Sequence, residues 1–401
     1  MKWEKVKLGD IATCIQPGPF GSQLHNSDYS KEGTPIIMPK DIVGGAIVHS
    51  GLLKVSEEHV KRLSRHQVYE GNLMVARKGD VRKCAYITAN ENGWMTGSDC
   101  LKVVLDESKC YPKFIYYQLR SEHIGRWLEK VSIGATMPSL NTGLLSGIEM
   151  VLPPIEIQKQ IAGILSVCDD LIENNQKQIK LLEEAAQRLY KEWFVDLRFP
   201  GHENTKIVDG VPEGWNEKTL SQVANVIMGQ SPKSEFYNSE KKGLPFHQGV
   251  GSYGVRFVMD DIYSTSYTRI AEPNSILFSV RAPVGRLNIT KSKVVIGRGL
   301  AAINQTDGCQ SYLYYLLKNR FFKDNIVGNG SIFASVSKDE LLNQKFLIPE
   351  RNLMMQFEKI VSQMDKQIEN LDSKNKKLIE ARDRLLPKLM SGGVNLWRTS
   401  T

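Results

Sequence analysis

The sequence has no hydrophobic run approaching the roughly 18 apolar residues that a membrane span requires, so we expect none. Residues 1–7 contain no apolar core, and we therefore expect no secretory signal. Cysteine is scarce: the six residues are scattered along the chain and form no CxxC pair. Reduced thiols in a cytoplasmic protein are the simplest interpretation of that pattern.

Motifs of common catalytic sites are also absent. The chain has no GxxxxGKS/T loop for ATP, and its seven histidines show neither HExxH nor a Cys/His spacing suited to a metal. It lacks the Asn/Asp-Pro-Pro-aromatic motif of amino-methyltransferases. Residues 249–254 match GxGxxG, but strand-like residues follow where a dinucleotide site needs a helix. We therefore predict a chain that binds rather than catalyses and that holds no cofactor or metal of its own.

The composition is that of an ordinary globular protein. Of 401 residues, 41% are hydrophobic and 24% are charged, which excludes disorder for most of the chain. The length is enough for two to four compact units of roughly 100–200 residues each. Lys and Arg outnumber Asp and Glu by 52 to 44, for a formal charge of +8. That balance permits a polyanionic partner without proving one.

The chain repeats one plan twice. Ser139 matches Ser335, Pro153 matches Pro349 and Asp169 matches Asp365, always 196 residues apart, and Gly134 matches Gly330 at the same offset. Near the start of each half, Trp3 matches Trp215 at an offset of 212. The second part of each repeat therefore keeps its length, while the first part varies in its loops. A pseudo-twofold internal repeat is the simplest arrangement of two such halves.

Two long helices are predicted from apolar residues that recur every three or four positions in residues 153–199 and 349–395. About 40 residues at 1.5 Å each make a helix roughly 60 Å long, whose apolar seam needs a partner. We predict that the two helices form an antiparallel coiled coil. Pairing Asn175 with Asn375 fixes its register, because an Asn facing Ile would leave its amide unsatisfied. The alternative is that one or both Asn residues lie at a solvated edge.

That register pairs the two Asn residues and places apolar residues opposite each other elsewhere along the seam, except where Cys168 faces Arg382. It places Leu165 against Leu385. The central seam residues are Ile172, Asn175, Ile179 and Leu182 from the first helix and Ile368, Leu371, Asn375 and Leu378 from the second.

The remaining segments, residues 1–152 and 200–348, are predicted to be mixed α/β domains. Runs rich in β-formers occur at residues 34–38, 73–76, 101–105 and 275–280, separated by Gly, Asn and Pro. The fold class is therefore α+β: two α/β domains separated by two long helices.

Basic residues occupy corresponding loops of the two domains. Residues 273–306 contain five bases and no acid, and the corresponding loop of the first domain holds Arg77, Lys78, Arg82 and Lys83 with only Asp80 opposed. Recurrence in both halves suggests two equivalent contacts with one phosphate-rich ligand. The alternative, for either loop, is that its basic residues are exposed to solvent and bind no ligand.

The order of several motifs resembles that of the specificity (S) subunit of type I restriction–modification systems, over essentially the full length. Residues 152–162, Leu-Pro-Pro-Ile-Glu-Ile-Gln-Lys-Gln-Ile-Ala, carry this resemblance and have a weaker echo in residues 348–357. Residues 134–140, 245–249 and 71–80 are also similar to the family's pattern. The second copy departs from it, with Pro349-Glu350-Arg351 where the first has a second proline.

The resemblance implies a non-catalytic subunit that binds double-stranded DNA. Residues 1–152 and 200–348 would be target-recognition domains, each recognising one half of a split site, and the helices would set the spacer between the halves. Two modification subunits carrying S-adenosylmethionine would dock on the helices and methylate adenine. Restriction subunits would join for cleavage dependent on ATP and Mg²⁺. Apolar helix residues outside the seam, namely Ile164, Leu181 and Phe194, are candidates for docking the modification subunits.

We expect a few side chains in each domain to contact DNA, with Lys and Arg on phosphates and others on base edges in the major groove. Gln248 is suited to bidentate pairing with adenine and an Arg to pairing with guanine. The glycines of residues 249–254 would let the backbone approach DNA closely, although a plain hairpin turn is an equal alternative. The candidates are Ser22, Gln23, Lys40, Arg77, Lys78, Arg82 and Lys83 in the first domain and Gln248, Tyr253, Arg256, Arg281 and Arg286 in the second.

Two other hypotheses remain open at this point. The chain could be a coiled-coil scaffold whose basic loops bind RNA or an acidic protein, in which case DNA sequence would not matter. It could also be the specificity half of a fused restriction–methylation enzyme, in which case catalytic motifs would adjoin it; the sequence contains none.

Overall fold

A computed structural model describes residues 3–132, 138–321 and 335–391. The chain divides into two compact units, residues 1–174 with 374–401 and residues 175–373. Each unit therefore contains one α/β domain and half of each long helix, a division different from the predicted domain boundaries. The matched pair Gly134 and Gly330 and most of the motif at residues 134–140 lie outside the described residues.

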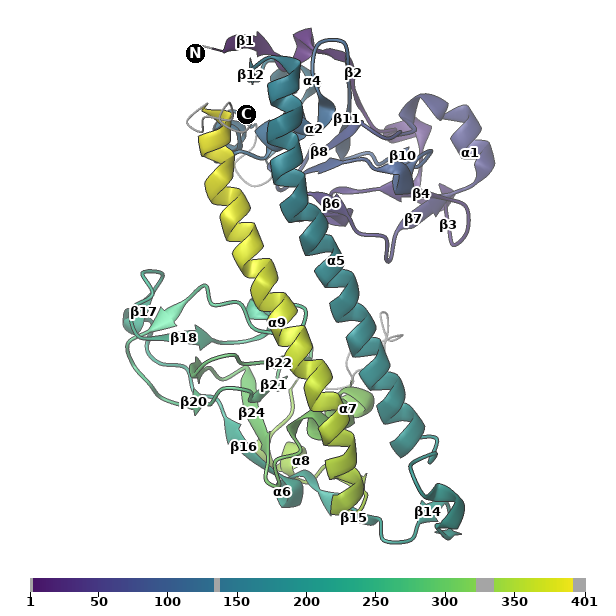
Figure 1. Ribbon diagram of the computed structural model, residues 1–401, viewed down its shortest axis with the longest axis vertical. Helices are drawn as coiled ribbons and strands as arrows, with labels where there is room; N and C mark the ends of the chain where they lie inside the picture. Colours follow the sequence, from purple (N-terminus) through teal and green to yellow (C-terminus); the bar gives the residue numbers. More distant parts are fainter. Residues whose placement is uncertain (1–2, 133–137, 322–334, 392–401) are drawn as a thin grey trace, which may run out of the picture. The chain divides into compact units, whose positions relative to one another are not determined.

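The two long helices each have 40 residues: α5 (Ile155–Phe194) and α9 (Arg351–Met390). Their bounds differ by the same 196 residues as the sequence repeat. The first half of α5 and the last half of α9 belong to one unit, and the converse halves belong to the other. Within each unit the two helix segments run in opposite directions (Figure 1). The prediction of long antiparallel helices is therefore confirmed.

The first unit contains two four-stranded sheets, in the orders β2-β11-β8-β9 and β10-β4-β7-β3, and two strand pairs, β1-β12 and β5-β6. Its strands are β1 (Glu4–Lys7), β2 (Ala12–Pro17), β3 (Tyr29–Ser30), β4 (Thr34–Ile37), β5 (Ile42–Val43), β6 (Ala46–Ile47), β7 (Leu53–Val55), β8 (Leu73–Ala76), β9 (Cys84–Tyr86), β10 (Met95–Thr96), β11 (Cys100–Leu105) and β12 (Glu149–Leu152). Its shorter helices are α1 (Glu57–Arg62), α2 (Pro112–Leu119), α3 (Glu122–Val131) and α4 (Thr142–Ser146).

The second unit repeats this plan, with sheets in the orders β16-β24-β21-β22 and β17-β19-β18-β23-β20 and the pairs β15-β25 and β13-β14. Its strands are β13 (Ile207–Val208), β14 (Val211–Pro212), β15 (Asn216–Thr219), β16 (Ala224–Met228), β17 (Tyr237–Asn238), β18 (Leu244–His247), β19 (Tyr263–Ser264), β20 (Ile270–Ala271), β21 (Ile276–Ser279), β22 (Leu287–Ile289), β23 (Val294–Ile296), β24 (Leu300–Gln305) and β25 (Lys345–Ile348). Its shorter helices are α6 (Leu220–Val223), α7 (Gln310–Phe321) and α8 (Lys338–Leu342).

The strand that opens each domain pairs with the strand that closes it, which confirms both repeat offsets. Glu4 pairs with Leu152 in β1-β12, and Asn216 pairs with Ile348 in β15-β25. The opening residues are 212 apart and the closing residues 196 apart, as the sequence predicted. Because the last strand of each domain leads directly into a long helix, the strand pair joins the start of each domain to the beginning of its helix.

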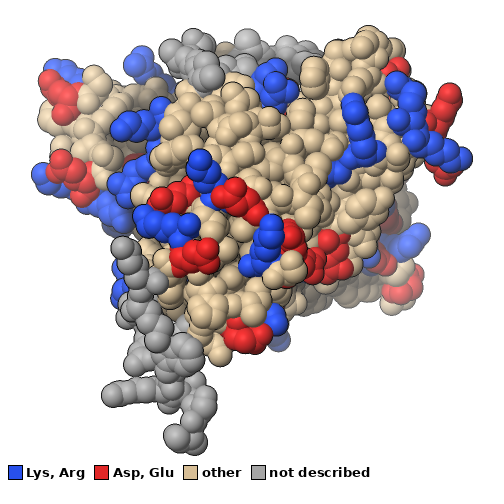
Figure 2. Space-filling model, turned by 90° about the horizontal axis from the view of Figure 1, so that it is seen from above, with Lys and Arg blue, Asp and Glu red and all other residues tan. Residues whose placement is uncertain are grey.

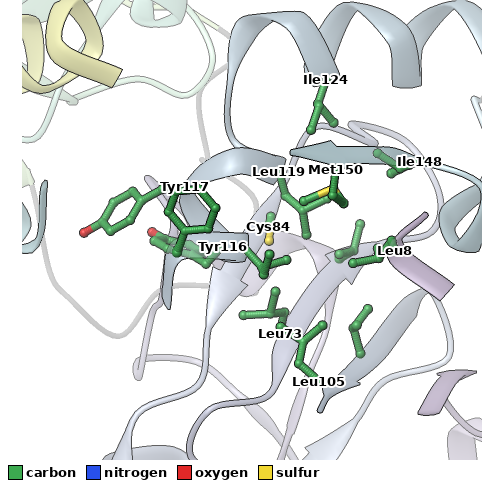
Figure 3. Packing of buried hydrophobic residues seen from close by; sticks show 14 of the residues in the cluster. Leu8, Leu73, Cys84, Leu105, Tyr116, Tyr117, Leu119, Ile124, Ile148 and Met150 are labelled. Carbon is green, nitrogen blue, oxygen red and sulfur yellow. The ribbon is translucent and has the colours of Figure 1, made fainter. Parts of the chain in front are cut away.

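The core of the first unit joins its domain to both helices. Ile157, Ile161 and Leu165 of α5 and Leu386 and Leu389 of α9 are buried in the same cluster as the aromatic residues of α2. Figure 3 shows part of this cluster, with Tyr116, Tyr117 and Leu119 of α2 beside Cys84, Ile148 and Met150. Burying these apolar side chains supplies the main stabilisation of the helix ends, which an isolated helix would leave in water.

The second unit has an aromatic core at the other helix ends. The ring of Phe357 in α9 lies 6.0 Å from both Tyr190 and Trp193 of α5, and Phe194 packs 5.0 Å from Tyr312 of α7. Phe194 is thus part of a packed core. Its predicted use as an exposed docking residue does not fit this position.

The predicted seam residues lie on the inner side of the helices. Ile172, Asn175, Ile368, Leu371 and Asn375 are at most 8% exposed, and Ile179, Leu182 and Leu378 are half-buried. Asn175 belongs to one unit and Asn375 to the other, so their pairing stays a prediction.

Candidate nucleic-acid interface

Lys78 and Arg281 occupy equivalent places in the two domains. Lys78 follows β8 and forms an isolated antiparallel bridge with Ser139, while Arg281 follows β21 and bridges Ser335. The two serines are 196 residues apart, the offset of the repeat. Both basic residues are exposed at the end of a buried central strand. The two domains therefore present a cation at corresponding loops.

In the second domain this loop borders a cavity of about 200 Å³. The cavity brings together two predicted contact residues, Gln248 and Arg281, whose side chains are exposed. The residues that complete its lining are Gly249, Val250, Ser279, Ala282 and Gly299. A primary amide and a guanidinium at one opening are the groups that recognise adenine and guanine edges bidentately.

The backbone around Gln248 is held by two glycines. Gly297 donates its N–H to the carbonyl of His247 at 2.8 Å, and Gly299 donates to the carbonyl of Gln248 at 3.1 Å. A Cβ at Gly299 would lie 2.5 Å from that same Gln248 oxygen, so no larger residue fits without moving the strand. Gln248 directly follows β18, and these bonds from the turn after β23 hold its backbone beside the parallel pair β18-β23.

Two of the predicted contacts in the second domain are committed to the protein interior. The Tyr253 hydroxyl donates to the carbonyl of Leu277 at 2.9 Å, and burial raises the pKa of its phenol. Arg256 is 2% exposed, with its guanidinium bound to Glu183 and Asp365 of the long helices. Neither side chain reaches a ligand outside without breaking these bonds. The expectation that Tyr253 and Arg256 contact DNA does not fit the structure.

Arg286 keeps a position suited to a ligand. It is exposed, and its backbone N–H donates to Ser279 Oγ at 2.8 Å, beside the cavity lining.

In the first domain three loops meet around the end of β8. The Arg77 guanidinium lies 5.6 Å from the centre of the Phe20 ring, which joins the turn that contains Ser22 and Gln23 to this strand. Lys83 Nζ donates to the carbonyl of Pro39 at 3.1 Å and so holds the adjacent turn that contains Lys40. The structure thus brings together most of the side chains that the sequence nominated in this domain.

The nominated side chains of the first domain differ in their exposure and in the protein groups that they already bind. Ser22, Lys40 and Lys78 are exposed, with Lys40 bound to Asp41 at 2.6 Å and Lys78 to Asp99 at 3.1 Å. Gln23 is half-buried, and its carbonyl accepts from Arg62. The Lys78–Asp99 pair is exposed on both sides and therefore weak, so Lys78 can exchange its carboxylate for a phosphate at small cost, whereas the carboxylate of Asp41 beside Lys40 is buried.

Arg82 has a different role from the one expected. Its guanidinium binds Glu122 and, at 3.3 Å, Glu129 of α3. The hydrogen bond and charge of Glu122 raise the pKa of Arg82. Arg82 is therefore better assigned to holding α3 against the β8-β9 loop than to DNA contact.

Phe20 is 54% exposed beside Arg77 and was missed, because a single aromatic in a Gly/Pro-rich loop gives no periodic signal.

Basic and acidic residues are mixed on one face of the molecule. The face of the molecule in Figure 2 carries Lys and Arg interspersed with Asp and Glu, without a continuous basic patch. Within residues 3–132, 138–321 and 335–391, no group of His, Cys, Asp or Glu is arranged to hold a metal ion. Across those same residues, no helix combines the length and apolarity needed to cross a membrane.

Three comparisons agree on what the chain is similar to. Residues 1–184 and 212–381 match the family model described as the type I restriction modification DNA specificity domain. The MjaX specificity subunit of a type I restriction enzyme of Methanocaldococcus jannaschii is 29% identical over 98% of this chain and 94% of its own length. The MjaIX specificity subunit of the same organism is 25% identical over 97% of this chain and 93% of its own.

Among solved structures, the type I restriction–modification S subunit from M. genitalium has a TM-score of 0.57. It is 18% identical and covers 97% of this chain and 96% of that one. This likeness shows the fold: two mixed helix/strand domains with long helices.

Proposed function

The chain belongs to the type I restriction–modification DNA specificity family, and we propose from this premise that it recognises a DNA site in two separated parts, one part with each domain. Members of the family are non-catalytic subunits that recognise DNA. The comparisons give no support to the alternative of a scaffold for RNA or acidic protein.

The single observation that carries the split site is the equivalence of Lys78 and Arg281. Each is exposed after a central strand, and each is held by a backbone bridge to a serine at the repeat offset. Two equivalent loops, on sheets of the same strand order in the two domains, are suited to two half-sites that differ in the side chains presented.

We propose that the second half-site is recognised by Gln248, Arg281 and Arg286 around the 200 Å³ cavity. The first half-site would be contacted by Ser22, Gln23, Lys40, Arg77, Lys78 and Lys83, with Phe20 beside Arg77. Phosphate contacts would fix the register of the protein, and the amide and guanidinium groups would select bases.

The methylated base in this proposal is adenine, and the methyl transfer takes place on partner subunits. Two modification subunits would carry S-adenosylmethionine and dock on the long helices, and restriction subunits would supply the ATP- and Mg²⁺-dependent cleavage. Ile164 and Leu181 are 39% and 64% exposed, as a docking role needs. Val167 and Leu171 are 57% and 45% exposed and continue the stripe of Ile164 along α5.

The test is to map methylated adenines in cells that carry this protein and its modification subunits. We expect two short defined sequences at a constant separation. Exchanging residues 1–152 with the corresponding domain of a related subunit should change one of these sequences and leave the other. A single undivided sequence, or methylation without sequence preference, would refute the proposal.

A further inference from the structure

A buried arginine of the second domain joins the two long helices within the second unit. Arg256 is 2% exposed, and its Nη1 lies 3.1 Å from Glu183 of α5 while its Nη2 binds Asp365 of α9. Nη1 also donates to the Tyr315 hydroxyl of α7 at 3.1 Å, and the guanidinium lies 4.5 Å from the centre of the Tyr314 ring. One side chain thus contacts three helices. Because the N–H groups of a guanidinium point in fixed directions, these contacts hold the domain in one orientation on the helices.

A second cation of the same domain lies one heptad further along α9. Lys291 Nζ lies 2.6 Å from Asp372, donates to Ser373 Oγ at 3.0 Å and lies 4.4 Å from the centre of the Phe257 ring. Asp365 and Asp372 are seven residues apart and therefore share one face of α9. Arg256 and Lys291 together fix both the rotation and the axial position of this domain on α9.

The first unit neutralises the corresponding carboxylate differently. Asp169 of α5, the repeat equivalent of Asp365, accepts from Tyr117 of α2 at 2.7 Å and from Arg382 of α9 at 2.7 Å. The repeat equivalent of Arg382 is Ala186, which is fully buried. The second unit therefore lacks the helix-borne arginine at this position. In the first unit a domain arginine, Arg120, lies 3.9 Å from Asp169 in addition to Arg382, whereas in the second unit the domain's Arg256 binds Asp365 directly.

Arg256 is also the end of the segment that begins at Gln248. Between them, Ser252 Oγ lies 2.9 Å from His247 Nδ1, the Tyr253 hydroxyl binds the Leu277 carbonyl, and Asn288 Nδ2 donates to the Gly254 carbonyl at 3.0 Å. Hydrogen bonds or buried side chains thus hold this segment along its length, from Arg256 at the helices to Gln248 at the cavity. The segment and the cavity are therefore held as one body, so a displacement at Arg256 would move the whole recognition surface relative to the helices without rearranging the groups that line the cavity.

We propose that Arg256 is a positioning residue for DNA recognition, which sets the orientation of the second recognition domain on the helices and thereby the spacer accepted between half-sites. This inference rests on the proposed function. It assigns Arg256 no contact with DNA. Its specific consequence is that loss of Arg256 alters spacer selectivity separately from base selectivity and from stability.

The experiment uses the full chain with its modification subunits and measures methylation of DNA sites whose spacer is natural, one base pair longer or one shorter. The variant is Arg256→Met combined with Glu183→Gln and Asp365→Asn, so that no unpaired charge is buried. We expect the preference for the natural spacer to fall about tenfold, while the two half-site sequences remain those of the wild type. Lys345→Met, which breaks an exposed ion pair with Glu217 in the same unit, is the matched control and should change nothing.

A second variant tests whether Arg256 acts by joining the domain to the helices or only by neutralising the carboxylates that it binds. Arg256→Met with Ala186→Arg supplies the helix-borne arginine that the first unit has at Arg382. We expect it to retain the relaxed spacer preference of the neutral variant. If the helix-borne arginine restores spacer selectivity, or if the neutral variant keeps it, Arg256 only compensates charge and the inference is wrong. If the wild type itself methylates no split site, the proposed function fails instead.

Discussion

Arg382 of α9 donates from Nη1 to Oδ1 of Asp169 in α5 across 2.7 Å. This contact joins the last part of one helix to the first part of the other, in agreement with the opposite directions of the two segments in the first unit (Figure 1). The side chain of Arg382 is 11% exposed and that of Asp169 25%. The Tyr117 hydroxyl completes the site by donating to the other carboxylate oxygen at 2.7 Å.

Arg382→Met should destabilise the first unit. The substitution keeps an apolar stem of similar length but leaves the partly buried Asp169 without its main cation, at an expected cost of about 1–3 kcal/mol. Urea denaturation of the full chain followed by circular dichroism measures this loss. Arg384→Met is the control, since its ion pair with Glu380 is exposed and should be worth less than about 0.5 kcal/mol. Equal effects of the two substitutions would contradict the assignment.

The long helices could be predicted from the sequence because apolar spacing is a local property of the chain. The partner of Arg382 could be predicted only to within one residue: the register placed Arg382 opposite Cys168, whereas it binds the adjacent Asp169. A long side chain reaches the neighbouring position when a carboxylate is there, and heptad geometry alone does not take this into account.

The interior role of Arg256 was missed for a different reason. A basic residue in a loop has the same local pattern whether it faces solvent or a buried carboxylate. A signal did exist in the repeat. Asp169 and Asp365 are equivalent, yet only Asp169 has an arginine at the facing helix position, where Ala186 stands in the other copy. A cation from the second domain was therefore required at Asp365, and comparing the copies would have indicated it.

Arg281→Ala should relax base selectivity in the second half-site only. A bidentate arginine contributes roughly 1–3 kcal/mol of discrimination against the wrong base, so one position of that half-site should become degenerate. Gln248→Ala should affect a different position of the same half-site, because both side chains line one cavity. Sequencing of methylated adenines shows which positions change. Lys293→Ala, an exposed residue paired with Glu272, serves as the control.

If Arg281→Ala instead weakens methylation equally at all sites and leaves the consensus intact, Arg281 contacts phosphate. The same outcome for Gln248→Ala would remove the cavity from the recognition surface altogether, because an amide has no charge with which to bind phosphate.

Lys40→Ala should weaken DNA binding without changing the sequence recognised. Its side chain is exposed, and its ammonium group contacts Asp41 and the Gly51 carbonyl, so it is suited to a phosphate contact. Losing one phosphate contact should reduce the slope of log K against log salt concentration by about 1. Fluorescence anisotropy with labelled duplex at several salt concentrations measures the slope for wild type and variant. A change in base preference with an unchanged slope would show that Lys40 contacts a base edge.

Two exposed apolar residues of α5 should matter for assembly and little for folding. Val167→Asp and Leu171→Asp place a charge on the stripe that the structure leaves uncovered, which any partner packed there would have to desolvate. We expect the full chain to keep its thermal stability and to lose co-purification with modification subunits. Gln176→Asp, at an exposed position of α5 turned about 120° around the helix from Ile164, is the control for added charge. Retention of both partners by the Asp variants would exclude this stripe as a docking surface.

The first unit should lose stability as the pH falls from about 6.5 towards 4, through His66. This ring is 3% exposed, and burial, together with Arg65 and Lys102, lowers its pKa from 6.5 to about 4. Arg65 Nε donates to His66 Nε2 at 3.1 Å, so that nitrogen must be unprotonated. Because the folded-state pKa lies below the unfolded one, the unfolded chain binds the extra proton in this range. The contribution of His66 is complete above pH 6.5 and is lost on acidification, by roughly 2 kcal/mol between pH 7 and pH 5. Thermal denaturation of wild type and His66→Asn at these two pH values tests this: the variant, which has no titrating group at this position, should show the smaller difference between them. An equal difference would mean that the pKa of His66 is the same in the folded and the unfolded chain.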